Sequence, residues 1–319
     1  MKKILLYNSG GGLGDSIQLF SLILSLQNHY KKAEFFYLGA HSNHFNGQLK
    51  DFGIKIDTLD LKLKYFGFRW WHLFAIKQRI NQMAIEKFDL IIDLQSKIRN
   101  TIILLRIPHN NFYSSTFGFK FCSKKSDYDS KNHLVNLNKF FNTSIKSINY
   151  NLKKIPEIYK EEAKRLLPDK NYIGFSITQG NEYRKKSWKV KNFVDLANKI
   201  SNENKTPVFF IKKDNKELIK EIKSQVPTAM FPEIQTRIAS PPLVAALGSR
   251  LDLAVSIDNG VMHMLSLAKI PMIVLFGPTD SEKFSPEGDS IKILDSKTIY
   301  RTKNINSISV YDVFKLIQF

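Results

Sequence analysis

The chain has 319 residues, which is enough for two domains of ordinary size. A hydrophobic content of 43% and a charged content of 24% are typical of a globular protein, and no apolar run reaches the ~20 residues of a membrane-spanning helix. The balance of 48 Lys and Arg to 29 Asp and Glu gives a net charge of +19, which favours an anionic partner or surface, although the cations are dispersed. The single cysteine, Cys122, excludes an internal disulfide and a multi-cysteine metal site, and it is typical of a reducing cytoplasm.

The N-terminal segment has the strand, glycine-rich loop and helix that open a doubly wound sheet. We predict a strand over Lys3–Tyr7, a loop over Asn8–Ser16 and a helix over Ile17–Leu26. The loop lacks the dinucleotide-binding glycine spacing, and Asp15 stands where a P-loop has Lys. Because a carboxylate repels phosphate, we do not expect this loop to hold a nucleotide's phosphates. It instead offers a carboxylate at a helix N-terminus, where an acceptor hydroxyl could meet it. The alternative is that Asp15 caps the helix.

Residues 62–86 are rich in aromatic and basic side chains. One interpretation is a loop or amphipathic helix that touches lipid or a glycolipid acceptor. The other is a helix whose Trp and Phe side chains lie in the core. We expect most of these aromatics in the core, with Phe66 to Trp70 the exposed part. A strand over Phe88–Gln95 follows, with Lys97 and Arg99 after it.

A second strand-first unit begins after a polar linker, which we place at Asn142–Pro156. Its first strand is Tyr172–Ile177, and the loop after it carries Arg184, Lys185 and Lys186 beside a glycine. Cations at the carboxyl end of a strand can offset the charge of a departing diphosphate. The alternative is a solvated basic turn.

The stretch from Leu251 to Asp280 predicts a strand–turn–helix unit followed by a second strand, Pro271–Phe276. The turn, Asp258-Asn259-Gly260, would direct backbone N–H groups and the positive end of a helix dipole into the crevice where α/β sheets bind ligands. His263 falls in the first helical turn. An ordinary helix cap is the competing interpretation.

The same stretch resembles the lipopolysaccharide heptosyltransferases, glycosyltransferase family nine. The similarity rests on Asp258-Asn259-Gly260-Val261-Met262-His263 and on Leu275-Phe276-Gly277-Pro278-Thr279. The family usually has Ser or Thr where this chain has Asn259. Gly14-Asp15, the strand ending in Gln95, and Lys186 two residues before Trp188 also match. The resemblance spans nearly the whole chain, most closely at 4–26, 88–99, 174–197 and 242–279.

The resemblance implies a GT-B fold, in which two Rossmann-like doubly wound α/β domains face each other across a cleft. Residues 1–150 would form the acceptor domain, 151–304 the nucleotide-sugar domain, and 305–319 a terminal helix that packs back on the fold. The implied activity is inverting, metal-independent transfer of a sugar, heptose in the family, from a nucleotide-diphospho-sugar to lipopolysaccharide or another surface glycan.

The resemblance also assigns roles to individual residues, with Asp15 as the general base. The donor side would comprise Lys186, Arg184, Glu217, Asp258, Asn259, Gly260, Val261, His263 and Thr279. The acceptor side would comprise Gly12, Gly14, Gln95 and Arg99. No cofactor or metal is expected. Asp127-Tyr128-Asp129 has the D-x-D form of metal-dependent glycosyltransferases, but three residues in a polar loop are a weak signal.

The expected partners are the donor and an anionic glycolipid or glycan acceptor. The expected location is the cytoplasm, with peripheral contact at the inner membrane. No nucleic acid is expected, because the chain lacks a recognition motif. Two other functions stay open: a non-catalytic protein that binds a nucleotide-sugar or anionic glycan, and a sugar-nucleotide epimerase of similar fold.

Overall fold

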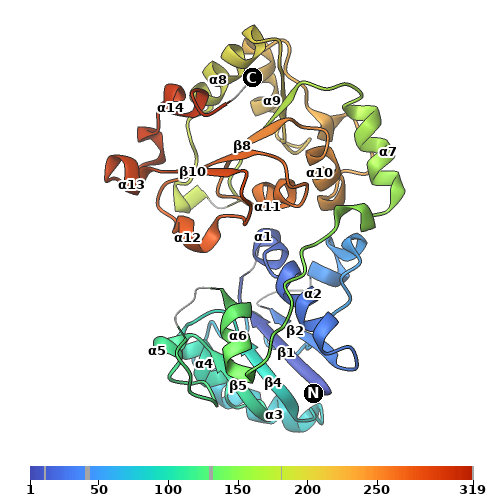
Figure 1. The fold of residues 1–319 in the computed structure, drawn as a ribbon, viewed down its shortest axis with the longest axis vertical. Helices are drawn as coiled ribbons and strands as arrows, with labels where there is room; N and C mark the ends of the chain where they lie inside the picture. Colours follow the sequence, from blue (N-terminus) through green and yellow to red (C-terminus); the bar gives the residue numbers. More distant parts are fainter. Residues whose placement is uncertain (11, 40–43, 129–131, 181, 318–319) are drawn as a thin grey trace. The chain divides into compact units, whose positions relative to one another are not determined.

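The computed structural model describes residues 1–10, 12–39, 44–128, 132–180 and 182–317. The chain divides into two compact units, Met1–Tyr150 and Asn151–Phe319. Each unit is built on one parallel β-sheet with helices packed on both faces (Figure 1). Among the described residues, no helix combines the length and the apolar character needed to cross a lipid bilayer.

The described strands of the first unit follow the order β3-β2-β1-β4-β5, with parallel neighbours. This is the order of the first five strands of a Rossmann sheet, and it reverses direction between β1 and β4. The elements are β1 (Lys3–Asn8), α1 (Leu13–Ile17), α2 (Phe20–His29), β2 (Glu34–Gly39), β3 (Asp57–Thr58), α3 (His72–Gln82), β4 (Phe88–Asp93), α4 (Ile98–Leu104), β5 (His109–Ser114), α5 (Thr116–Phe119) and α6 (His133–Phe141).

The described strands of the second unit follow the order β10-β9-β8-β6-β7, and the order reverses between β6 and β8. Counted from its own first strand this is the flavodoxin-like doubly wound order. The elements are α7 (Glu157–Leu166), β6 (Tyr172–Ser176), α8 (Val190–Asn202), β7 (Thr206–Phe209), α9 (Lys216–Gln225), α10 (Pro241–Gly248), β8 (Leu253–Ile257), α11 (Gly260–Ser266), β9 (Met272–Phe276), α12 (Ser281–Phe284), β10 (Ile291–Asp295), α13 (Ser296–Tyr300) and α14 (Val310–Phe314).

The central strands β1, β4, β6, β8 and β9 are buried on both faces, as parallel strands between helices must be. In the second unit, one face of the sheet packs on α8, α9 and α14, while α7, α10 and α11 pack together as another helical group. In the first unit, α3 and α4 contribute Ile76, Ile80 and Ile103 to one core. On another side Phe20 packs its ring against Phe45, Phe52 and Tyr150. The terminal helix α14 packs on α8 inside the second unit, with Val313 buried.

The structure corrects the helix predicted over Ile17–Leu26, because two helices occupy that region. The first, α1, starts four residues earlier than predicted, at Leu13, and α2 starts at Phe20. The Leu19 N–H bonds to Ser16 O, 3.2 Å away and only three residues back, which tightens the turn and ends α1.

The prediction that most aromatics of residues 62–86 are core is wrong. Trp71 and Phe74, expected in the core, are 56% and 79% exposed, and Phe66, expected to be exposed, is 1% exposed. Phe68 and Trp70 are exposed as expected, at 40% and 56%. The reason is helical phase. Since α3 turns His72, Ile76 and Ile80 into the core at a spacing of four residues, Phe74 must point to the opposite side.

Candidate functional sites at the sheet switch points

Open parallel sheets bind ligands outside the carboxyl ends of their strands, where the strand order reverses. In this chain those edges lie at the ends of β1 and β4 in the first unit and of β6 and β8 in the second. The loops that carry Asp15 and Gln95 follow β1 and β4, and those that carry Lys186 and Asp258 follow β6 and β8. Most of the predicted site residues therefore lie at one of two switch points.

Asp15 is half-buried in the first turn of α1, where its Oδ2 accepts a hydrogen bond of 3.1 Å from the Gly12 N–H. The interpretation of Asp15 as a helix cap is therefore confirmed. Gly10 also lies against this side chain, since a Cβ added there would come within 2.5 Å of Asp15 Cγ. The loop thus needs Gly10 for the carboxylate to lie where it does, and the carboxylate stays accessible.

Gln95 belongs to the same polar network. Its Nε2 donates to Asn8 Oδ1, and its Oε1 accepts from Ser9 Oγ at 2.9 Å. Asn8 in turn donates through Nδ2 to Asp15 O at 3.2 Å and accepts from the Gly10 N–H at 2.9 Å. The loops after β1 and β4 are therefore joined, and the backbone around Asp15 is held from two strands.

The other predicted acceptor-side residues have structural contacts. Gly14 is buried within α1. Arg99 donates from Nε to Gly67 O at 2.5 Å and lies 5.9 Å from the centre of the Phe68 ring. Its contacts therefore position the loop before α3. Gly12 is exposed and donates to Asp15, as described above.

Lys186 and Asp258 form an ion pair in the second unit, with 12% and 7% of their side chains exposed. Two anchors fix the loop that presents Lys186. Its own N–H donates to Gln179 Oε1 at 2.9 Å, and the buried Trp188 donates from Nε1 to Ile308 O at 2.9 Å. The Lys186 ammonium also lies 5.9 Å from the centre of the Phe284 ring. Asp258 thus orients the ammonium.

Asn259 joins the ends of β6 and β8. Its Oδ1 accepts from the Met262 N–H at 2.9 Å and so caps α11, while its Nδ2 donates to Ser176 Oγ at 2.7 Å and to Thr178 O at 3.0 Å. Ser or Thr could cap the helix but could not make the amide contacts. Gly260 and Val261 are partly exposed in the first turn that this cap organises.

His263 is 5% exposed, and burial lowers its pKa to about 4. Asp258 opposes this shift, and Lys186 adds to it. The imidazole is therefore neutral at pH 7. It lies in α11 beside the switch point but brings no positive charge to it.

The remaining donor-side residues are more scattered. Arg184 is exposed in the loop after β6, and Glu217 is exposed in the first turn of α9. Neither makes a hydrogen bond or ion pair with Lys186 or Asp258 in the part of the chain that the structure describes. Thr279 follows β9, and its Oγ1 is buried with no hydrogen-bond partner among the described atoms. Such a hydroxyl favours a polar partner supplied from outside.

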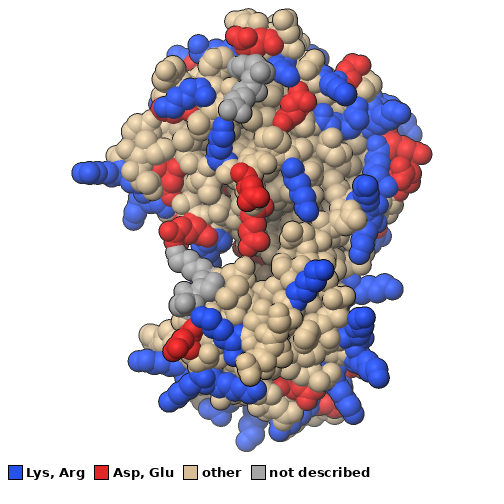
Figure 2. Space-filling view, viewed as in Figure 1, with Lys and Arg blue, Asp and Glu red and all other residues tan. Residues whose placement is uncertain are grey.

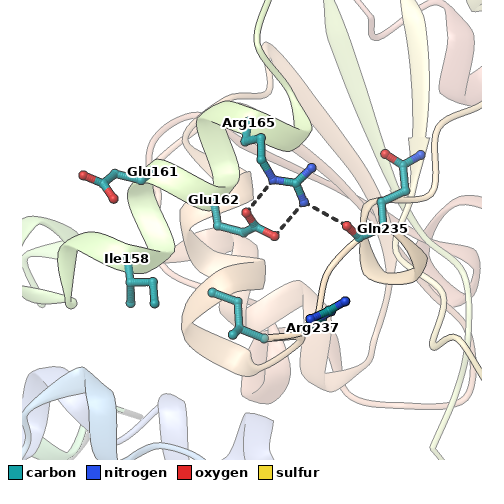
Figure 3. A pocket seen from close by; sticks show the side chains of 7 residues that line it. Ile158, Glu161, Glu162, Arg165, Gln235 and Arg237 are labelled. Carbon is teal, nitrogen blue, oxygen red and sulfur yellow. Dashed lines mark hydrogen bonds and ion pairs between the residues drawn. The ribbon is translucent and has the colours of Figure 1, made fainter.

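Two hollows lie elsewhere on the second unit. One of about 520 Å³ lies between α7 and residues 235–238 (Figure 3). Arg165 donates there to both Glu162 oxygens, at 2.7 and 2.8 Å, and the pair lowers the pKa of Glu162 to about 2. The other hollow, about 890 Å³, follows α9 and has four lysines in its lining. Neither is lined by a residue predicted for the site.

Side chains that could bind a metal ion are also not clustered in the described part of the chain. Within the described ranges, no group of three or more His, Cys, Asp or Glu side chains is arranged to hold a metal ion. Asp129 of the D-x-D sequence lies outside the described residues.

Comparison with known proteins decides the family. The model of glycosyltransferase family 9 (heptosyltransferase) matches residues 75–313, which is most of the chain. The chain belongs to glycosyltransferase family 9. No curated protein sequence matches it. The family match identifies the chain as a glycosyltransferase.

Solved structures share this fold at low sequence identity. A family-9 glycosyltransferase from Veillonella parvula is 20% identical, with a TM-score of 0.69 over 99% of this chain and 96% of that one. Escherichia coli heptosyltransferase WaaC with ADP is 15% identical, with a TM-score of 0.66 over 99% and 96%. A UDP-GlcNAc 2-epimerase from Methanocaldococcus jannaschii is 14% identical, with a TM-score of 0.56 over 100% and 92%. The GT-B fold class is confirmed.

Sequence reasoning missed several residues of the two candidate sites. Asn8 and Ser9 connect Asp15 to Gln95, and Phe284 lies near Lys186. Asp93 is fully buried at the end of β4, where Thr101 and Ser114 donate to it at 2.6 and 2.8 Å. The polar residues at the ends of β1 and β4 were a usable signal for Asn8, Ser9 and Asp93, whereas Phe284 has no local signature.

Proposed function

We propose that this family-9 glycosyltransferase is an inverting, metal-independent enzyme that moves a sugar from a nucleotide-diphospho-sugar to a lipopolysaccharide or other surface-glycan acceptor. The observation that carries the proposal is the half-buried Asp15 carboxylate, fixed at the β1/β4 switch point of a family-9 chain. A carboxylate oriented by its loop and still reachable suits a general base.

In the proposed reaction Asp15 takes the proton of an acceptor hydroxyl. The acceptor oxygen attacks the anomeric carbon of the donor as the bond from that carbon to the phosphate oxygen breaks, so the configuration inverts. The electron pair of the broken bond leaves with the nucleoside diphosphate. Asn8 and Gln95 support the step by fixing the loop backbone around Asp15.

The departing diphosphate needs compensation for its growing negative charge. Lys186 is the best placed cation, because Asp258 and the anchored loop orient its ammonium. The N–H groups of Gly260 and Val261, in the turn capped by Asn259, are the proposed backbone donors. Fixed donors of this kind can replace a metal ion. A neutral His263 would support the turn by packing.

The proposed acceptor is a glycan or glycolipid presented at the cytoplasmic face of a membrane. The solved relatives include Escherichia coli ADP-heptose LPS heptosyltransferase II, which is 15% identical with a TM-score of 0.63 over 99% of this chain and 97% of that one. That likeness supports heptose as the first donor sugar to test, with Arg184, Glu217 and Thr279 as proposed donor contacts.

The test has two stages. Thermal shift against ADP-, GDP- and UDP-sugars finds the donor. Release of nucleoside diphosphate from that donor is then measured with and without a lipopolysaccharide lacking its outer sugars. The proposal expects release only when the acceptor is present, together with a heavier acceptor by mass spectrometry. An epimerised sugar-nucleotide without an acceptor would favour the epimerase, and donor binding with no turnover would favour a binding protein.

A further inference from the structure

An exposed aromatic surface lies on the first unit, around the N-terminal end of α3. It comprises five large side chains, which we call the aromatic patch: Tyr65 (51% exposed), Phe68 (40%), Trp70 (56%), Trp71 (56%) and Phe74 (79%). The chain has 3 Trp residues, and the third, Trp188, is buried. Two of the chain's three Trp side chains, which are large and mainly apolar, therefore lie together on this surface.

The aromatic patch is held in place by the backbone beneath it. Phe66 is buried and meets the Tyr7 ring edge to face at 5.5 Å, and Tyr7 Oη donates to Phe66 O at 3.1 Å. The next residue, Gly67, donates to His72 Nδ1 at 3.2 Å and accepts from Arg99 Nε at 2.5 Å. These bonds fix the loop before α3, so the exposure of its aromatic side chains is built into the fold.

Helical phase keeps Phe74 out of the core. Trp70 O accepts the Leu73 N–H at 3.0 Å and Trp71 O accepts the Phe74 N–H at 3.1 Å, so the two Trp residues form the turn that leads into α3. The opposite side of the helix is fully used by His72, Ile76 and Ile80. No rotation of α3 could bury Phe74 without exposing this core face.

The segment that carries the aromatic patch is mainly positive. From Leu61 to Ile85 the sequence contains five cations, Lys62, Lys64, Arg69, Lys77 and Arg79, and no Asp or Glu. Lys97 adds a sixth, 5.9 Å from the centre of the Phe68 ring. Lys62 pairs with Asp60 at 2.7 Å, which leaves a clear excess of positive charge.

We infer that the aromatic patch docks this enzyme on an anionic lipid bilayer. Trp, Tyr and Phe place their rings at the boundary between headgroups and acyl chains, and Lys and Arg beside them meet anionic headgroups. Charge alone would not distinguish this surface, because cations are spread over the visible face of each unit (Figure 2). The lysine-lined hollow along α9 supplies a contrast, since none of its lining residues is aromatic.

The docking surface adjoins the β1/β4 switch point within the first unit. Tyr7 lies in β1, and Arg99 lies in α4, directly after β4. The loop before α3 is therefore bonded to β1 and to the helix that follows β4, the two strands whose following loops lead to Asp15 and Gln95. Docking would bring this edge to a lipid surface, where a lipid-linked acceptor is displayed; that use rests on the proposed function, whereas the docking itself does not.

Flotation with vesicles tests the docking without measuring sugar transfer. The full chain is mixed with vesicles of phosphatidylcholine or of phosphatidylcholine with about 30 mol % phosphatidylglycerol. We expect flotation with the anionic vesicles only. The triple variant Trp70→Ser/Trp71→Ser/Phe74→Ser should have a partition coefficient on the anionic vesicles that is lower by about tenfold or more. For Arg69→Gln the partition coefficient should fall about fivefold. A matched control, Ile158→Ser/Ile299→Ser/Tyr311→Ser, removes three exposed apolar side chains of the second unit and should float like the unchanged protein.

Tryptophan fluorescence gives a second measurement. Lipids brominated on the acyl chain should quench the emission of the unchanged chain and leave that of Trp70→Phe/Trp71→Phe, which keeps only the buried Trp188, nearly unaffected. Flotation of the triple variant equal to that of the unchanged protein would overturn the inference, as would absence of flotation. A dimer by light scattering that the triple substitution dissociates, without vesicle binding, would assign the patch to self-association. If the unchanged protein floats with the anionic vesicles but shows no transferase activity, that result contradicts the proposed function and leaves the docking inference standing.

Discussion

The loops that follow the first strand of each unit occupy equivalent places in two doubly wound sheets, yet they are built differently. The loop after β1 is short and glycine-rich, and it folds tightly around the Asp15 carboxylate. The loop after β6 is longer, is anchored at its far end by the buried Trp188, and holds out Lys186. The same position in the fold therefore presents an acid in one unit and a cation in the other.

The difference shows how a shared architecture is given separate chemistry. The contacts around Asp15 are neutral: its carboxylate accepts from the Gly12 N–H, and its backbone carbonyl accepts from the Asn8 amide, which in turn accepts from Gln95. Lys186 is fixed by an opposite charge, Asp258, in a nearly dry setting. The first arrangement leaves a negative charge available to take a proton. The second keeps a cation desolvated and oriented, but binds it to a carboxylate that a ligand must outcompete or share.

Asp15→Asn should have the largest effect. The amide can still accept the Gly12 N–H bond, so the fold should persist, but it cannot take a proton at neutral pH. Turnover should fall about 100- to 10,000-fold while donor affinity stays within about twofold. Steady-state kinetics and thermal shift measure the two quantities. Asp57→Asn on strand β3 is the matched control; equal turnover in both variants would remove Asp15 from the chemistry.

Lys186→Gln should reduce turnover about 100-fold or more, and should also lower the free energy of unfolding by about 3–5 kcal/mol, because it leaves Asp258 buried and unpaired. The double variant Lys186→Gln/Asp258→Asn should recover most of the stability and none of the turnover. Urea denaturation and kinetics separate these outcomes.

The control for this pair is Lys205→Gln/Asp252→Asn, which removes a more exposed ion pair of 2.9 Å in the same unit. Its stability should change by less than about 1 kcal/mol. If the double variant at Lys186 and Asp258 regains turnover along with stability, the ammonium has only a structural role.

His263 should make stability depend on pH. Burial lowers its pKa from 6.5 to about 4, so between these values the unfolded chain binds a proton that the folded chain does not. The stability contributed by the neutral imidazole is complete above about pH 6.5 and is lost as the pH falls toward 4, by about 3 kcal/mol in all. Urea midpoints of His263→Gln should fall less steeply over this range. The exposed His29→Gln serves as the control, and a slope unchanged in His263→Gln would contradict the assignment.

Gly10→Ala should have the smallest effect of the four. The new methyl would lie 2.5 Å from Asp15 Cγ and must displace the carboxylate, which should reduce turnover about tenfold. Gly180→Ala makes the same change in the loop after β6, where an added Cβ meets nothing within 4 Å, and should leave turnover unchanged. Similar turnover in the two variants would mean that the tight packing around Asp15 does not matter for the reaction.

The sequence predicted much of this fold because its signals are local. Strands such as Lys3–Tyr7 and Tyr172–Ile177 are apolar runs ended by glycine or polar residues, and the structure contains them within a residue or so of the predicted ends. Strands β3, β5 and β10 were not predicted. Asp57-Thr58 and His109–Ser114 are largely polar, and their place in the sheet depends on the neighbours with which they pair.

The sequence by itself determined the strand-first opening of each unit, the family signature from Asp258 to Thr279, and the choice of Asp15 and Lys186, because these depend on residue type and spacing. Only the tertiary structure decided which contacts those residues make. It paired Lys186 with Asp258, used Arg99 to position Gly67, and turned Trp70, Trp71 and Phe74 to the surface. The physical reason is that a side chain's partners and its exposure depend on the phase of its helix and on segments distant in sequence, such as Ile308 beneath Trp188.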